Sequence, residues 1–238
     1  MRVVGLTGGI ASGKSTVSAQ LRRRHGFRVV DADAIAHAVC AKGRWGYRRV
    51  VAAFGGGVLR PDGELDREAL AALVFSDAAA RRRLQAATHP AVALELLRQV
   101  AAAWLSFRLV VVIDMPLLFE TGSHRFTRPR VLVAADAATQ LARLAARDGC
   151  GDAAARARVA AQMPLEAKAR LADVVLDNGG PPEALAPQVD ALAARLRRGA
   201  LLPGLLASPL GVVLAALAAR AWGARLLGAV AGLLRGRA

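Results

Sequence analysis

The chain has 238 residues, 55% of them hydrophobic, which is enough for a buried core and excludes disorder as the main state. Its 33 Lys and Arg against 18 Asp and Glu give a net charge of +15, which suits nucleic acid, an anionic membrane or a polyphosphate substrate. Only 4% of the residues are aromatic, and we find no zinc-finger or RRM signature, so we expect no nucleic-acid role.

The first predicted strand, residues 3–6, leads directly into the spacing Gly8-x4-Gly13-Lys14-Ser15. This spacing is typical of a phosphate loop, in which backbone N–H groups face the phosphates, Lys14 reaches the β and γ phosphates, and Ser15 binds Mg²⁺. Residues 16–24 are expected to form the helix whose N-terminus faces the anion. We therefore expect ATP and Mg²⁺ as cofactors, bound by Gly8, Gly9, Ile10, Ala11, Ser12, Gly13, Lys14, Ser15 and Thr16.

Two carboxylates, Asp31 and Asp33, follow the second predicted strand, residues 27–30. Their place at the carboxyl end of a strand puts them near the phosphate loop, where one of them can accept a proton from an incoming hydroxyl. The alternative is that Asp33 only caps a helix beginning at Ala34. The preceding phosphate loop favours the catalytic interpretation.

Three further apolar runs predict strands, and helical patterns separate all five. We expect an α/β fold of the P-loop kinase type: a parallel five-stranded sheet flanked by helices, with ligands at the carboxyl ends of the strands. A mostly helical insertion, residues 34–106 with a break at 54–63, would hold the second substrate. An Arg-rich segment, residues 147–171, is expected to form a lid. The three runs are residues 109–113, 130–133 and 174–176.

Cys40 and Cys150 lack the spacing of metal ligands or of a CxxC motif. They fit free buried thiols in a reducing compartment, and neither is a good candidate for a nucleophile. Because the predicted first strand begins so early, we expect no signal or transit peptide before this domain.

Taken together, six segments resemble the dephospho-CoA kinase family in order and spacing over about residues 1–198. The resemblance implies phosphorylation of the ribose 3′-hydroxyl of dephospho-CoA by ATP, the last step of coenzyme A synthesis. One residue departs from the common bacterial pattern: Ala11 stands where bacterial members often have glycine, as in eukaryotic single-domain members. The segments are GLTGGIASGKST, VVDADAIAHAV, THP, DMPLLFE, TQLARLAARDG and VLDNGG.

The resemblance also implies roles for single residues. Asp33 matches the general base, with Asp31 beside it on the substrate side, and Arg143 matches a cation on the phosphates. Arg147 lies one helical turn further along, so both guanidinium groups would share one helix face. A solvated helix face is an equally good explanation for either arginine alone.

Other matched positions allow two interpretations each. Pro116, Leu117 and Leu118 resemble an acceptor-side loop that holds the pantetheine or adenine portion, and Asp114 before them could coordinate metal or water. His89 is either a substrate contact or a packing histidine. Asn178 and Gly179 would approach the nucleotide base, although this pair also suits an ordinary turn.

Residues 200–219 carry no charge, and we expect residues 200–238 to form a separate hydrophobic tail outside the core. As a helix, residues 201–219 would extend about 28 Å, close to the thickness of a bilayer core. Pro203, Gly204 and Pro209 weaken such a span. We expect an intracellular protein that associates with a membrane through this tail, with the kinase domain facing the cytosol. The alternatives are a soluble apolar appendage and an oligomer contact.

Two other functional classes compete with the dephospho-CoA kinase. One is another P-loop small-molecule kinase acting on a nucleoside or nucleotide, and the other is a P-loop binding protein without transfer chemistry. The Asp31-Ala32-Asp33 sequence and the PLLFE sequence at residues 116–120 favour a dephospho-CoA kinase over another small-molecule kinase. A binding protein without transfer chemistry is disfavoured because we find no convincing base-reading N-K-x-D motif, and because Lys14, Ser15 and Asp33 are intact.

Overall fold

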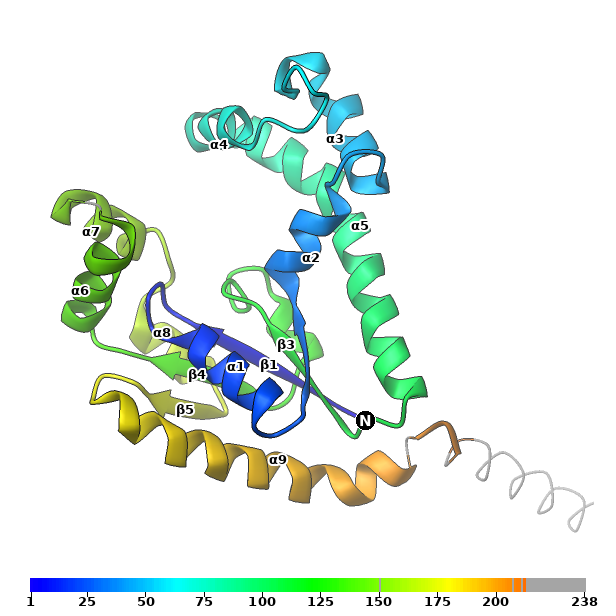
Figure 1. The fold of residues 1–238 in the computed structure, drawn as a ribbon, viewed down its shortest axis with the longest axis vertical. Helices are drawn as coiled ribbons and strands as arrows, with labels where there is room; N and C mark the ends of the chain where they lie inside the picture. Colours follow the sequence, from blue (N-terminus) through cyan, green and yellow to red (C-terminus); the bar gives the residue numbers. More distant parts are fainter. Residues whose placement is uncertain (150, 207, 211, 213–238) are drawn as a thin grey trace, which may run out of the picture.

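The structure, a computed structural model, describes residues 1–149, 151–206, 208–210 and 212. Within these residues, five parallel strands form one sheet in the order β2-β3-β1-β4-β5 (Figure 1). Each apolar run that predicted a strand overlaps one of them, so the expected α/β class and parallel five-stranded sheet are confirmed. The strands are β1 (Arg2–Gly8), β2 (Arg28–Asp31), β3 (Val110–Asp114), β4 (Arg130–Ala134) and β5 (Val174–Asp177).

Helices α1 (Lys14–Arg23) and α9 (Leu185–Leu206) cover one face of the sheet. Side chains alternate along a strand, so Val110 and Val112 of β3 join the core on this face, while Val111 joins the core on the other. Each fully buried valine or leucine contributes roughly 1.5–3 kcal/mol to stability. This layer therefore fixes α1, and with it the loop between β1 and α1, against the sheet.

The long helix α5 (Ala78–Leu105) covers part of the opposite face with its C-terminal half. Its residues Leu96, Val100 and Ala103 pack with Val30 of β2 and Val111 of β3. The short helix α8 (Leu165–Leu171) contacts β4. The sheet thus has helices on both faces, as the alternation of strands and helices predicts.

The helices between β2 and β3 form a second apolar cluster away from the sheet. In Figure 1, α3 and α4 stand beyond the sheet, joined to it through α2 and α5. Burial raises the pKa of the Cys40 thiol, and Arg67 offsets this only in part, so Cys40 is a poor nucleophile as expected. Cys150 lies outside the described residues. The elements are α2 (Ala32–Val39), α3 (Trp45–Phe54), η1 (Gly56–Val58) and α4 (Arg67–Ser76), and the cluster contains Cys40, Val50, Val58, Leu65, Leu70 and Ala87.

Pro90 lies inside α5 without breaking it. Proline has no N–H, so the carbonyl of Ala86, four residues earlier, loses its helical donor. Arg49 of α3 supplies replacements: its Nη2 donates to the Ala86 oxygen at 3.1 Å and its Nε to the Ala87 oxygen at 2.9 Å. The helix is therefore continuous because a neighbouring helix satisfies the freed backbone group.

Beyond β4, helices α6 (Ala137–Asp148) and α7 (Asp152–Ala160) contact each other and stand at the far side of the sheet from α5 (Figure 1). Asp136 caps α6 by accepting from the Thr139 N–H at 2.8 Å, and Gly149, with φ 61°, ends it. The residues expected to form a lid thus include the end of α6, α7 and α8. Short 3₁₀ turns occupy η2 (Ser123–Phe126) and η3 (Pro182–Ala184).

Helix α9 passes through the position at which the sequence suggested that a separate tail begins. Ala200 is 1% exposed and packs in the same core cluster as Leu196, so the expectation that the chain has left the core at Ala200 is wrong. Among the described residues, no helix is both long and apolar enough to span a membrane. Most of the proposed span from residue 207 onward, including all of 213–219, lies outside the described residues.

Candidate active site

The carboxyl ends of three strands bring separate motifs to one edge of the sheet. In the sheet register, Asp114 at the end of β3 lies beside Asp31 of β2 on one side and Leu6 of β1 on the other. The glycine-rich loop leaves β1 two residues after Leu6. The end of β3 therefore meets two segments that lie far earlier in the sequence, as expected for a parallel sheet.

Two left-handed backbone positions shape the loop between β1 and α1. Gly13 has φ 87° and caps α1, and Ala11 has φ 56°. Glycine adopts this conformation freely, whereas an alanine does so at a cost of roughly 1–2 kcal/mol. Ala11 therefore keeps a backbone path suited to glycine. The loop delivers Lys14 and Ser15 to the first turn of α1, at the positive end of the helix dipole.

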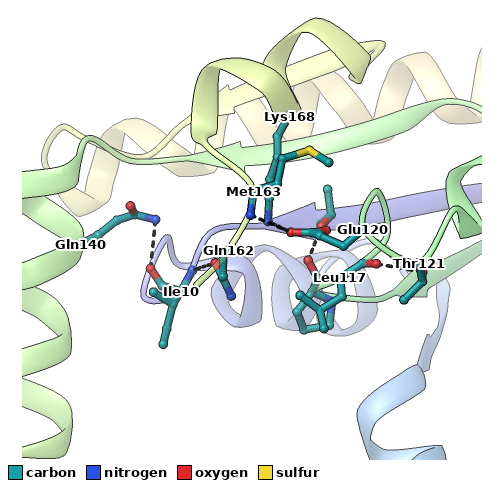
Figure 2. Close-up of polar contacts among 10 residues, drawn as sticks. Ile10, Leu117, Glu120, Thr121, Gln140, Gln162, Met163 and Lys168 are labelled. Atoms are coloured by element: carbon teal, nitrogen blue, oxygen red, sulfur yellow. Dashed lines mark hydrogen bonds and ion pairs between the residues drawn. The ribbon is translucent and has the colours of Figure 1, made fainter. Parts of the chain in front are cut away.

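Side-chain amides from three distant segments hold this loop. Gln140 of α6 donates to the Ile10 oxygen at 3.0 Å, and Gln162 accepts from the Ile10 N–H at 2.9 Å (Figure 2). Asn178, after β5, donates to the Ser12 oxygen at 2.8 Å. The backbone of the loop is thus fixed before a ligand arrives, which lowers the entropic cost of binding phosphate.

Lys14 forms an ion pair with Asp114. Asp114 is only 4% exposed, and a buried carboxylate requires such a partner. The structure thereby places the predicted phosphate-binding lysine against the acid at the end of β3. Asp114 is therefore part of the site, whichever group it binds when the nucleotide is present.

The two carboxylates of the DAD segment have different surroundings. Asp31 caps α2, because its Oδ1 accepts from the Ala34 N–H at 2.9 Å. The helix begins at Ala32, so the alternative in which Asp33 caps a helix at Ala34 is wrong. Asp33 lies in the first turn of α2, and burial raises the pKa of its carboxyl, with Lys14 lowering it and Asp31 and Asp114 raising it. Asp31, and not Asp33, is therefore the cap of this helix. The Asp33 carboxylate lies among the charges of the site.

The two arginines of α6 differ in their surroundings. Arg147 lines a cavity of about 260 Å³ together with the whole glycine-rich loop, Ser15, Pro116 and Gln162. Its guanidinium also pairs with Asp148, at 2.7 Å. Arg143 is not part of that lining, but its Nη1 is buried and has no hydrogen-bond partner among the described residues. Both arginines remain candidates, and the geometry places Arg147 at the cavity itself.

The segment after β3 contacts the end of β1, just before the glycine-rich loop. The Thr7 hydroxyl of β1 donates to the Pro116 oxygen at 2.8 Å. Leu117 is exposed, as a substrate contact requires, whereas Leu118 is fully buried and also lines an apolar cavity of about 510 Å³ beside α5. His89 is exposed on α5 and lines this second cavity, so it does not belong to the cavity at the glycine-rich loop.

Sequence reasoning missed Gln140, Gln162 and the loop-holding role of Asn178. Asn178 is 7% exposed and contacts the protein loop, and the N–H of the neighbouring Gly179 bonds Asp177 Oδ1 at 2.9 Å. A single glutamine on a polar helix gives no signal of its partner in the sequence. The chemistry of the side chain is the only hint, because an uncharged amide can both accept from an N–H group and donate to a carbonyl group of a loop.

The cavity at the glycine-rich loop suits a nucleotide triphosphate with its magnesium ion. Ser15 lines it, and the Asp114 carboxylate is held at the same edge of the sheet by Lys14. Hydroxyl and carboxylate oxygens are the protein ligands that Mg²⁺ prefers, with phosphate oxygens completing its shell. The residues present therefore fit ATP with Mg²⁺.

Comparisons with known proteins point to one family. A sequence model of dephospho-CoA kinase matches residues 2–183. A dephospho-CoA kinase of Anaeromyxobacter dehalogenans is 50% identical over 199 residues, which cover 84% of this chain and 94% of the relative. One of Arabidopsis thaliana is 46% identical over 198 residues, covering 83% and 85%. A solved structure from Thermus thermophilus has a TM-score of 0.71 at 37% identity and covers 82% of this chain and 97% of that one.

Proposed function

Because the chain belongs to the dephospho-CoA kinase family, we propose that its glycine-rich loop, Lys14 and Asp33 together transfer phosphate from ATP to the ribose 3′-hydroxyl of dephospho-CoA. The chain is a kinase of coenzyme A biosynthesis. The observation that carries the assignment of residues is the meeting of Lys14, Asp114 and Asp33 at one edge of the sheet. The alternative, a nucleoside or nucleotide kinase, is not favoured by the comparisons.

On the acceptor side, Asp33 takes the proton of the attacking 3′-hydroxyl. Its raised pKa makes it a stronger base than an ordinary aspartate once it is ionised. Asp31 supports this role by capping α2, which fixes the turn of helix that carries Asp33. The helical insertion and the Pro116–Leu117 turn border this edge of the sheet and are proposed to hold the rest of dephospho-CoA.

On the donor side, the protein stabilises negative charge and positions the phosphoryl group. Lys14 would leave Asp114 partly or fully to reach the phosphates, and Ser15 with Asp114 would hold Mg²⁺, which neutralises phosphate charge when bound. Arg147 lines the cavity and would meet the charge that develops during transfer. The α6–α8 segment that carries Arg147 is proposed to close over the nucleotide as a lid.

A coupled assay of ADP release tests this function directly. We expect turnover with dephospho-CoA and ATP–Mg²⁺, and background rates with adenosine, AMP or shikimate as the acceptor. Phosphorus NMR of the product should show a new 3′-phosphomonoester. Equal or faster turnover of adenosine or AMP would instead identify a nucleoside or nucleotide kinase.

Replacing Arg143 or Arg147 by lysine is expected to lower kcat by about tenfold or more without restoring the wild-type rate. A lysine keeps the charge but lacks the planar fork that binds two phosphate oxygens at once. Arg156, an exposed arginine of α7 paired with Asp152, provides a matched control, since Arg156→Lys should leave kcat unchanged. Wild-type kcat in both Arg143→Lys and Arg147→Lys would show that they are surface charges.

Membrane association is a separate proposal that rests on the sequence of residues 201–219. A chain ending at Leu210 keeps α9 and the buried Ser208. It also keeps Leu210, which lines a cavity together with Met1 and Trp104. We expect this shortened chain to retain kinase activity and to remain at the bottom of a flotation gradient. The full chain should float with phosphatidylcholine vesicles in high salt, which removes attraction between charges. A full chain that stays at the bottom would contradict the proposal.

A further inference from the structure

Lys168 of α8 has a fully buried side chain, 1% exposed, which is rare for a lysine. Its Nζ lies 2.8 Å from Oε1 of Glu120, the last residue of the DMPLLFE segment. The Glu120 side chain is 23% exposed, so only the lysine is fully removed from water, and the cost of removing it offsets much of what the attraction returns. The position of this pair therefore suggests a purpose beyond holding α8 in place.

The Glu120 carboxylate joins the DMPLLFE segment to the turn that precedes α8. The same Oε1 accepts a hydrogen bond from the Met163 N–H at 3.3 Å (Figure 2). Burial raises the pKa of Glu120, but the Lys168 ammonium and nearby backbone N–H groups lower it by more than burial raises it. The pKa of Glu120 is therefore below its usual range, and the group is a carboxylate. A charged Glu120 thus fixes Met163.

Met163 is the neighbour of Gln162, and Gln162 contacts the glycine-rich loop. Its side-chain oxygen accepts the Ile10 N–H at 2.9 Å, while Gln140 donates to the Ile10 oxygen on the other side. Figure 2 shows these contacts as one group, in which Gln162 lies between Ile10 and the Met163–Glu120–Lys168 contacts. Gln162 also lines the cavity at the loop.

We propose that Lys168 is a positioning residue for the phosphate loop, acting through Glu120, Met163 and Gln162. Lys168 holds the Glu120 carboxylate, Glu120 holds the Met163 N–H, and the adjoining Gln162 sets the direction of the Ile10 peptide. The inference rests on the proposed function in one respect, namely that this loop binds the phosphates of ATP. It links the loop to the DMPLLFE segment, so that the two sides of the site keep a fixed relation.

A second ion pair provides the matched control. Arg130 of β4 pairs with Asp173 at 2.7 Å, and Asp173 also accepts from the Arg130 backbone N–H, so this pair ties β4 to the turn before β5. Neither residue lines the cavity at the glycine-rich loop. Asp173→Asn should therefore lower the melting temperature without affecting the loop.

The first measurement is hydrogen exchange at the Ile10 amide in the ligand-free protein. Lys168→Met and Glu120→Gln are expected to speed this exchange at least about fivefold, because Gln162 no longer holds the amide. Asp173→Asn should leave it unchanged. If Lys168→Met and Glu120→Gln change the exchange no more than Asp173→Asn does, the pair is structural only and the proposal is overturned.

The second measurement is steady-state kinetics with ATP and dephospho-CoA. Glu120→Gln and Gln162→Ala should each lower kcat/KM for ATP, by up to about 10²-fold, since small errors in position are costly. The double variant should lose little more than the worse single variant, because both act through the same contact. Fully additive losses would overturn the proposal. If Lys168→Met does not fold, Glu120→Gln and Gln162→Ala still test the proposal by both measurements, because Gln162 is only half-buried.

The two measurements separate this inference from the proposed function. Hydrogen exchange needs no substrate, so altered exchange in Lys168→Met together with a wild-type protein that does not phosphorylate dephospho-CoA would overturn only the proposed function. Active wild-type protein with unaltered Ile10 exchange in both ion-pair variants would overturn only the positioning role.

Discussion

Lys14→Ala is expected to lower kcat/KM for ATP by about 10³-fold, because it removes the cation that meets the β and γ phosphates during transfer. The same change leaves the Asp114 carboxylate, which is 4% exposed, without its ion-pair partner. Breaking a buried pair by deleting one partner costs on the order of 3–5 kcal/mol, and the 19% exposure of the Lys14 side chain places this case at the low end. The single variant should therefore be less stable as well as inactive.

A double variant separates these two effects. Lys14→Met with Asp114→Asn removes both charges and leaves no buried ion without a partner, so most of the lost stability should return. Activity should not return, because the phosphate-binding cation is still missing. Melting temperature and ADP release measured on the same samples check both parts. Near wild-type turnover in folded Lys14→Ala would remove the phosphate-loop assignment.

Asp33→Asn is expected to lower kcat by about 10²–10⁴-fold while ATP binding changes little. The amide keeps the size of the side chain but cannot take the proton of the 3′-hydroxyl. Asp31→Asn is the matched control, because asparagine caps a helix about as well as aspartate and should preserve the hydrogen bond to the Ala34 N–H. Its effect on kcat and on stability should be small. A larger loss in Asp31→Asn than in Asp33→Asn would mean that the wrong carboxylate has been assigned as the base.

The pH profile offers a second check on Asp33. Its carboxyl has a raised pKa, mainly through burial, and the base works only when it is ionised. As the pH falls through this raised pKa, the base becomes protonated and kcat/KM falls, at a higher pH than for an ordinary aspartate. This acid limb should be absent from the residual activity of Asp33→Asn. An identical acid limb in that variant would assign the titration to another group.

The arrangement of strands and the phosphate loop could be predicted from local sequence. Apolar runs separated by helical patterns determine a parallel sheet, because buried strands read as continuous hydrophobic segments. The spacing of Gly8, Gly13, Lys14 and Ser15 is likewise a local property, since a loop around phosphate needs glycine conformations and a following helix within a few residues. The DAD segment was placed at the site by the same argument about strand ends.

Only the tertiary structure showed where the helices begin and end and which distant polar side chains contact one another. Asp31 rather than Asp33 caps α2, and Ala200 belongs to the core, because helix boundaries depend on packing as well as on local sequence. Gln140 and Gln162 lie 130 and 152 residues from their partner Ile10, and Lys168 lies 48 residues from its partner Glu120. A hydrogen bond or ion pair between such distant residues leaves no periodic pattern in the chain. It arises from the packing of α6, α8 and the turn before α8 around the sheet, which brings their polar groups to the glycine-rich loop and the DMPLLFE segment.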